Sequence, residues 1–187
     1  MQHTAGFTYN SSNNFLAEGY EEKKLFHSSS RSLEEEIESI SGLPLLYEPG
    51  SEWHYSISID ILARILEVVT KDKLLNILKE NIFYPLEMDE TNFFISEDKN
   101  KNLVETFEYN SVKSKLTDLT LDTRKLILYG YPANNENYCR GGHGLFSTAR
   151  DYIKFATMLI NGKDKNAKPL VNREALQSMR LNSLDTN

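Results

Sequence analysis

One tyrosine, Tyr55, stands where its phenol could take part in proton transfer. It follows a Pro-Gly turn and two aromatic residues, and it immediately precedes an apolar segment, residues 56–70, with helical spacing. A helix N-terminus carries roughly half a positive charge and favours a phenolate by about 1 kcal/mol. Because an isolated tyrosine keeps its proton at neutral pH, Tyr55 would also need a cationic neighbour to act as a base. By position alone, a structural tyrosine between core and surface is the simpler interpretation.

A second segment of interest is rich in glycine, residues 141–144 (Gly-Gly-His-Gly). A phosphate-binding loop would continue with Lys-Ser or Lys-Thr, and this segment does not. A tight turn that only glycine permits is the plain explanation.

Other side chains carry weaker signals. The lone Cys139 cannot form an intrachain disulfide, and its simplest role is that of a small buried apolar residue. Asp60 and Glu67 lie seven residues apart on one predicted helix, where solvated surface charge is the expected arrangement. No metal-ligand spacing joins the four histidines, so we expect no metal site. They are His3, His27, His54 and His143.

Composition narrows the class of protein. The 187 residues carry a formal net charge of -6, with a sequence pI of about 5.3 and 40% hydrophobic residues. These values are typical of one globular domain, and without a basic stripe they exclude nucleic acid as an expected partner. No membrane span and no signal peptide are predicted. Expressed as written, the chain would therefore be cytoplasmic, and its location is otherwise unknown.

Periodicity and capping residues predict a mainly helical chain with few strands. Residues 1–30 are expected to be loop, 91–95 a short strand and 96–104 a polar loop. Residues 103–130 are ambiguous, and 129–137 carry loop signals. The segment 56–70 has apolar residues around most of its circumference, so we expect it to be well buried. The predicted helices begin at Ser32, Ser56, Asp72, Thr148 and Asn172; the first ends at Gly42, the third before Pro85 and the fourth at Gly162.

Four collinear segments resemble the serine β-lactamase and penicillin-binding-protein superfamily, with its class C-like esterase branch the nearest. Residues 3–7 (His-Thr-Ala-Gly-Phe) resemble the family's His-Thr-Ser-Gly-Leu segment, and residues 49–67 resemble the segment that bears its catalytic tyrosine. Residues 82–91 resemble Ile-Phe-x-Pro-Leu-Gly-Met-x-x-Thr, and residues 141–151 resemble the glycine-rich turn with its Ser-Thr-x-x-Asp helix start. Together the four make a fairly specific match.

The resemblance implies an α+β fold of β-lactamase/transpeptidase type, of which this chain holds mainly the helical region. It implies acyl transfer through a serine acyl-enzyme without a cofactor, on a small-molecule ester or peptide-like substrate. Tyr55 is the one catalytic position that transfers, and Gly142 and His143 fall where the family's cleft edge would contact substrate. Ile57 replaces the asparagine of the Tyr-x-Asn form, which favours the esterase branch over β-lactam hydrolysis.

The family's Ser-x-x-Lys nucleophile motif would precede residues 3–7. The formal match at residues 96–99 (Ser-Glu-Asp-Lys) follows the tyrosine segment and lies in a charged loop, so we interpret it as chance. No Lys-Thr-Gly or related motif occurs. Residues 1–187 are therefore predicted to be a partial domain without the N-terminal nucleophile helix and the C-terminal strands.

Two functional hypotheses follow. The chain is a serine hydrolase fragment, inactive alone and completed by an N-terminal fragment in trans; a truncation, a split-gene half and a decayed remnant all stay open. Alternatively it is a non-catalytic helical module that binds a partner or ligand through the face left uncovered.

Overall fold

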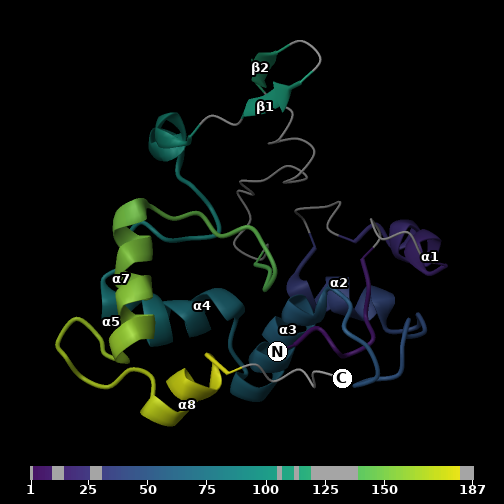
Figure 1. The fold of residues 1–187 in the computed structure, drawn as a ribbon, viewed down its shortest axis with the longest axis horizontal. Coiled ribbons are helices and arrows are strands. Elements are labelled where there is room, and N and C mark those ends of the chain that lie inside the picture. Colours follow the sequence, from purple (N-terminus) through teal and green to yellow (C-terminus); the bar gives the residue numbers. More distant parts are fainter. Residues whose placement is uncertain are drawn as a thin grey trace.

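Short helices joined by long loops make up most of the molecule (Figure 1). The structure is a computed structural model that describes residues 2–9, 15–25, 31–104, 107–111, 114–118 and 139–181. The helices are α1 (Ala17–Glu22), α2 (Leu33–Ile40), α3 (Ser58–Thr70), α4 (Leu74–Leu78), the π-helical η1 (Lys79–Phe83), α5 (Tyr84–Leu86), the 3-10 helix η2 (Glu97–Asn102), α7 (Ala149–Asn161) and α8 (Arg173–Ser178). The strands are β1 (Phe107–Asn110) and β2 (Lys115–Asp118).

Capping residues begin three of these helices where the sequence predicts. Ser32 forms a reciprocal capping box with Glu35 at the start of α2. Thr148 accepts the third backbone N–H of α7, and Asn172 does the same for α8. Gly162 ends α7 in the left-handed conformation, with a φ of 75°. These boundaries are confirmed.

Two element predictions are wrong, and one boundary is shifted. Residues 1–30 contain α1. The helix after Tyr55 is confirmed and ends at Thr70, but it begins at Ser58, two residues later than predicted. The helix of residues 72–82 was expected to end before Pro85, yet helical backbone continues through η1 and α5 to Leu86. Pro85 lies in the first turn of α5, where a missing backbone N–H costs little.

The strand expected at residues 91–95 is reduced to one antiparallel bridge. Asn92 and Phe146 exchange backbone hydrogen bonds of 3.0 and 2.8 Å. In the ambiguous region, β1 and β2 form an antiparallel hairpin that pairs Phe107 with Asp118. It stands apart from the helices (Figure 1). The loop predicted at residues 129–137 lies outside the described residues.

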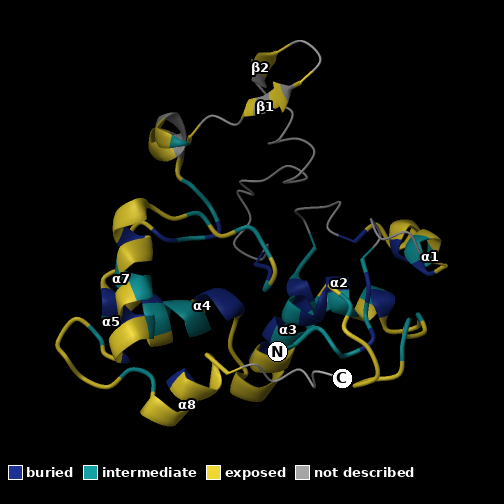
Figure 2. Cartoon of the chain, in the orientation of Figure 1, coloured by how far each residue is buried: buried dark blue, intermediate teal, exposed yellow. Residues whose placement is uncertain are grey.

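Two apolar clusters form the described core (Figure 2). The larger joins α3, α4, η1, α5 and α7, with Phe83 and Met158 among its buried members. The smaller joins the N-terminal region to the start of α3 through Tyr20, Leu25 and Ile57. The first turn of α3 therefore lies where both clusters meet.

The second half of α3 is less buried than its composition predicts. Ile65, Val68 and Val69 are exposed, Val69 to 74%. An apolar face around a helix is buried only if neighbouring elements cover all of it, and the described elements cover one side. None of the helices in the described ranges combines the length and the apolar character needed to cross a membrane.

Candidate active site

The segment that carries Tyr55 is held in place by the N-terminal residues. Residues 3–6 run beside residues 46–54 and accept three backbone hydrogen bonds from them. The bonds run from Leu46 to Gly6 (2.8 Å), from Gly50 to Thr4 (2.7 Å) and from His54 to His3 (2.8 Å). Gly6 has a φ of 82°, and a Cβ there would overlap the carbonyl oxygen of Tyr47. Glycine is thus required for this close approach.

Aromatic side chains surround Tyr55, which is itself 58% exposed. The His3 ring lies 4.8 Å from the Tyr55 ring, and the Tyr9 ring lies 5.5 Å away. The backbone N–H of Ser56 donates to Nδ1 of His3 at 3.3 Å, so the neutral ring carries its proton on Nε2. His54 faces away to Thr8, with 3.0 Å between Nε2 and Oγ1. Tyr55 is therefore an exposed phenol held beside two other aromatic rings.

The glycine-rich turn rests against the first turn of α3. Asp60 Oδ1 accepts the backbone N–H groups of Gly141 at 3.0 Å and Gly142 at 3.1 Å. A Cβ on Gly141 would overlap the Ile59 carbonyl oxygen, and one on Gly142 would lie 2.8 Å from Asp60 Oδ2. Two consecutive glycines let the turn come close enough for one carboxylate oxygen to hold both amides.

The prediction that Asp60 and Glu67 are solvated surface charges is wrong. Asp60 is completely buried and Glu67 is 7% exposed. Burial raises the pKa of Asp60, against the opposing effects of the Gly142 amide and nearby positive charge. Glu67 Oε1 accepts the first backbone N–H of α4, from Leu74, at 3.0 Å. Each carboxylate satisfies backbone donors that would otherwise be buried without acceptors.

A buried ion pair fixes the other end of the turn. Arg140 and Glu36 are both buried, with 3.2 Å between Nη2 and Oε1. Arg140 also donates to the carbonyl oxygens of Arg31 at 3.0 Å and Cys139 at 3.1 Å. The residue before the two glycines is thereby tied to α2, while the glycines are tied to α3.

The turn borders a cavity of about 440 Å³ between α3 and α4. His143 lines this cavity together with apolar residues such as Leu66, Leu78 and Phe93. Burial lowers the pKa of His143, which favours its neutral form. Among the described residues, Tyr55 is not part of the cavity lining. The predicted site residues thus share one turn: Gly142 and His143 both line the cavity, and Gly142 also lies close to the Tyr9 hydroxyl.

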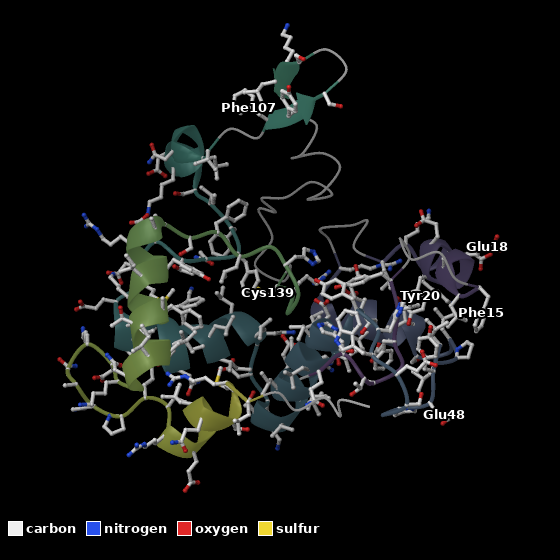
Figure 3. The ribbon with its side chains drawn as sticks, in the orientation of Figure 1. Phe15, Glu18, Tyr20, Glu48, Phe107 and Cys139 are labelled. Carbon is white, nitrogen blue, oxygen red and sulfur yellow. The ribbon has the colours of Figure 1, made fainter. Side chains whose placement is uncertain are left out.

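Residues 96–99 do not form a nucleophile site. The Lys99 ammonium donates to Glu90 at 2.7 Å in an exposed pair, and this bond raises the pKa of Lys99. A lysine held in its charged form cannot take a proton from Ser96. Cys139 is buried at 4% exposure, as the sequence predicts, and burial raises the pKa of its thiol to about 11 (Figure 3).

Sequence reasoning missed two residues of this site, Tyr9 and Asp60. Tyr9 lies three residues after the His-Thr-Ala-Gly segment. Asp60 is an acidic residue in the first turn of α3, and the two glycines that it contacts lie far away in the sequence. The available signal was that two consecutive glycine amides, if buried, need an acceptor such as a carboxylate. Nothing local indicated that residues 60 and 141 meet.

The Beta-lactamase family model matches residues 1–186. The chain belongs to the beta-lactamase family. It is 27% identical over 139 residues to the lovastatin esterase of Penicillium rubens, covering 71% of this chain and 32% of that protein. The structure of EstCE1, a hydrolase with promiscuous acyltransferase activity, matches with a TM-score of 0.69 and 26% identity, over 90% of this chain and 46% of EstCE1.

Simvastatin synthase (LovD) from Aspergillus terreus shares the fold, with a TM-score of 0.73 at 23% identity, over 99% of this chain and 42% of LovD. The β-lactamase/transpeptidase-like fold is thereby confirmed. This beta-lactamase family chain spans about a third of the lovastatin esterase and less than half of EstCE1 or LovD.

Proposed function

We propose that the chain carries the tyrosine part of a serine acyl-transfer site that acts on a small ester. The observation that supports this most is Tyr55, which is accessible and held between the His-Thr-Ala-Gly segment and the start of α3. The chain belongs to the beta-lactamase family, whose catalytic tyrosine segment residues 49–67 resemble, and this supports the role of base that we propose for Tyr55. The resemblance to the lovastatin esterase favours an ester over a β-lactam as the substrate class, and the hydrolase and acyltransferase EstCE1 agrees with acyl transfer.

The reaction would need a serine and a lysine that residues 1–187 do not supply at the family's position. The serine oxygen attacks the ester carbonyl while its proton passes to the lysine–tyrosine pair. The C–O bond to the alcohol then breaks and the alcohol leaves with that proton. Water next attacks the acyl-serine, its proton passes back through Tyr55, and the carboxylic acid and the free serine are released.

The exposed apolar side chains of α3 support completion by further polypeptide. Ile65, Val68 and Val69 face solvent among the described residues. The structural relatives are more than twice as long as the matched region and so have additional chain that could cover this face. We propose that the Ser-x-x-Lys segment belongs to this additional part. The alternative, a non-catalytic helical module, would use the same face for a partner.

Labelling with a fluorophosphonate tests the first half of this proposal. Residues 1–187 alone should remain unlabelled, because Lys99 is held in its charged form by Glu90 and cannot activate Ser96. A fluorescent penicillin should likewise fail to label it. Stoichiometric labelling at Ser96 would overturn the assignment.

Complementation tests the second half. A polypeptide from the family that carries the Ser-x-x-Lys helix, mixed with this chain, should produce hydrolysis of a p-nitrophenyl ester. Tyr55→Phe should then lower kcat by about 100-fold or more, since it removes the base. The matched control Tyr152→Phe changes an exposed tyrosine on α7 and should leave the rate unchanged. A folded, monodisperse mixture without activity would favour the non-catalytic module.

A further inference from the structure

Tyr9 lies directly beside the proposed base. Its ring centroid is 5.5 Å from that of Tyr55, with 35° between the two planes, and its hydroxyl is hydrogen-bonded to the Tyr55 side chain. Tyr9 is partly buried, whereas Tyr55 is 58% exposed. The two phenols thus form an inner and an outer member of one pair.

The inner phenol also meets the Asp60 anchor of the glycine turn. A Cβ built on Gly142 would lie 3.5 Å from the Tyr9 hydroxyl oxygen and 2.8 Å from Asp60 Oδ2, so both oxygens border the same glycine. Asp60 Oδ1 holds the two glycine amides, while the buried Oδ2 has no hydrogen-bond partner among the described residues. The absence of a side chain at Gly142 leaves room for Asp60 Oδ2, and the Tyr9 hydroxyl lies next to this contact at an ordinary packing distance.

We propose that Tyr9 is a positioning residue for Tyr55: its hydroxyl, lodged between the Asp60–Gly142 contact and Tyr55, donates a hydrogen bond that fixes the Tyr55 oxygen beside the start of α3. This inference rests on the proposed function and adds a residue to the proposed site. A hydrogen bond donated to a phenol oxygen stabilises the ionised form of the phenol. A tyrosine that acts as a base must adopt this ionised form.

The direction of this hydrogen bond follows from the surroundings of Tyr9. Burial, first, and then the nearby Asp60 carboxylate and the Tyr55 phenol all raise the pKa of Tyr9. When Tyr55 is ionised it has no proton of its own to donate, so Tyr9, which keeps its proton, is then the donor and the Tyr55 oxygen accepts. The other titratable groups next to Asp60 are His143 and Arg140, and both oppose the effect of burial on the pKa of its carboxyl group.

Fluorine NMR of the full chain, with fluorotyrosine in place of tyrosine, tests the inference without requiring catalysis. Fluorination makes the phenols more acidic and brings their titration into reach, and Tyr→Phe variants assign the resonances. Tyr55→Phe should lower the pKa of Tyr9 by about one unit, because the hydrogen-bond acceptor and its negative charge are both lost. Tyr152→Phe, far along the chain on α7, should leave the Tyr9 titration unchanged.

Asp60→Asn provides a second arm, since it removes the charge and keeps the carboxamide shape. It should also lower the pKa of Tyr9. If Asp60→Asn lowers the Tyr9 pKa and Tyr55→Phe does not, Tyr9 serves the Asp60 contact alone and the inference is wrong. Failure of the complementation experiment would contradict the proposed function and would not affect this titration result. The proposed function and the inference about Tyr9 can therefore fail separately.

Discussion

Asp60 shows how one carboxylate can organise a site without touching a substrate. Its Oδ1 collects two backbone amides of the glycine turn, and its Oδ2 faces the glycine against which Tyr9 lies. Hydrogen bonds to a charged acceptor contribute about 1.5–3 kcal/mol each when buried. The opposing cost is burial of the charge, which raises the pKa of the group.

Asp60→Asn should change how stability depends on pH. Because the folded chain holds the Asp60 proton more tightly than the unfolded chain does, the stabilisation from this group is complete below the unfolded aspartate pKa of about 3.9 and is lost as pH rises through the folded pKa. Asparagine keeps an acceptor and has no proton to lose. The free energy of unfolding of the variant should therefore increase relative to that of the parent as pH rises above about 4. The increase should be about 1.4 kcal/mol per unit of pKa shift.

Urea unfolding at a series of pH values measures this difference. Asp89→Asn, which changes an exposed aspartate, should show no comparable trend. A constant difference between the Asp60 variant and the parent from pH 4 to about pH 7 would contradict the burial argument.

Elements set by local chemistry could be predicted, and elements set by tertiary contact could not. Ser32, Thr148 and Asn172 bond to amides three residues away, so the sequence contains both partners of each cap. The exposure of Val69 depends on which elements cover α3, and no local pattern reports that. At the site, family motifs indicated Tyr55 and the glycine turn. The roles of Tyr9 and Asp60 depend on contacts with residues far away in the sequence, Tyr55 for the first and Gly141 for the second.

The contact between the glycine turn and α3 predicts unequal effects of alanine. Gly141→Ala would push a Cβ into the Ile59 carbonyl oxygen, and backbone cannot easily move aside, so we expect a loss of about 1–3 kcal/mol or more. Gly42→Ala is the matched control, because a Cβ there meets nothing within 4 Å. Thermal unfolding should show a lower midpoint for the first variant and an unchanged or slightly higher one for the second. Equal midpoints would show that the turn does not pack against α3.

At the scale of the whole molecule, buried polar contacts link separate elements. The Arg140–Glu36 pair joins the glycine turn to α2, and Glu67 joins α3 to the start of α4 through a backbone N–H. A buried ion pair such as Arg140–Glu36 adds little net stability, yet removing one partner leaves an uncompensated charge and costs several kcal/mol. The arrangement of these elements therefore depends on a few specific polar contacts as well as on apolar packing.

The reactivity of Cys139 should report on global unfolding. At a pKa of about 11, its thiolate fraction at pH 8 is roughly 200-fold below that of a free thiol with a pKa of about 8.5, and the side chain is 4% exposed. Modification by a disulfide reagent should be slow in native buffer and should accelerate with urea in parallel with unfolding. Ser178→Cys adds an exposed thiol on α8 that should react at once. Rapid reaction of Cys139 in native buffer would contradict its placement in the core.

The pairing of His3 with the Tyr55 ring also governs how the polypeptide can be handled in the laboratory. Because the two rings lie 4.8 Å apart, a purification tag joined ahead of Gln2 would emerge next to that phenol and crowd it. Fluorescent dyes or affinity handles are better attached through exposed side chains of α7, such as Tyr152 or Ile153 replaced by cysteine, where the aromatic group around position 55 stays undisturbed.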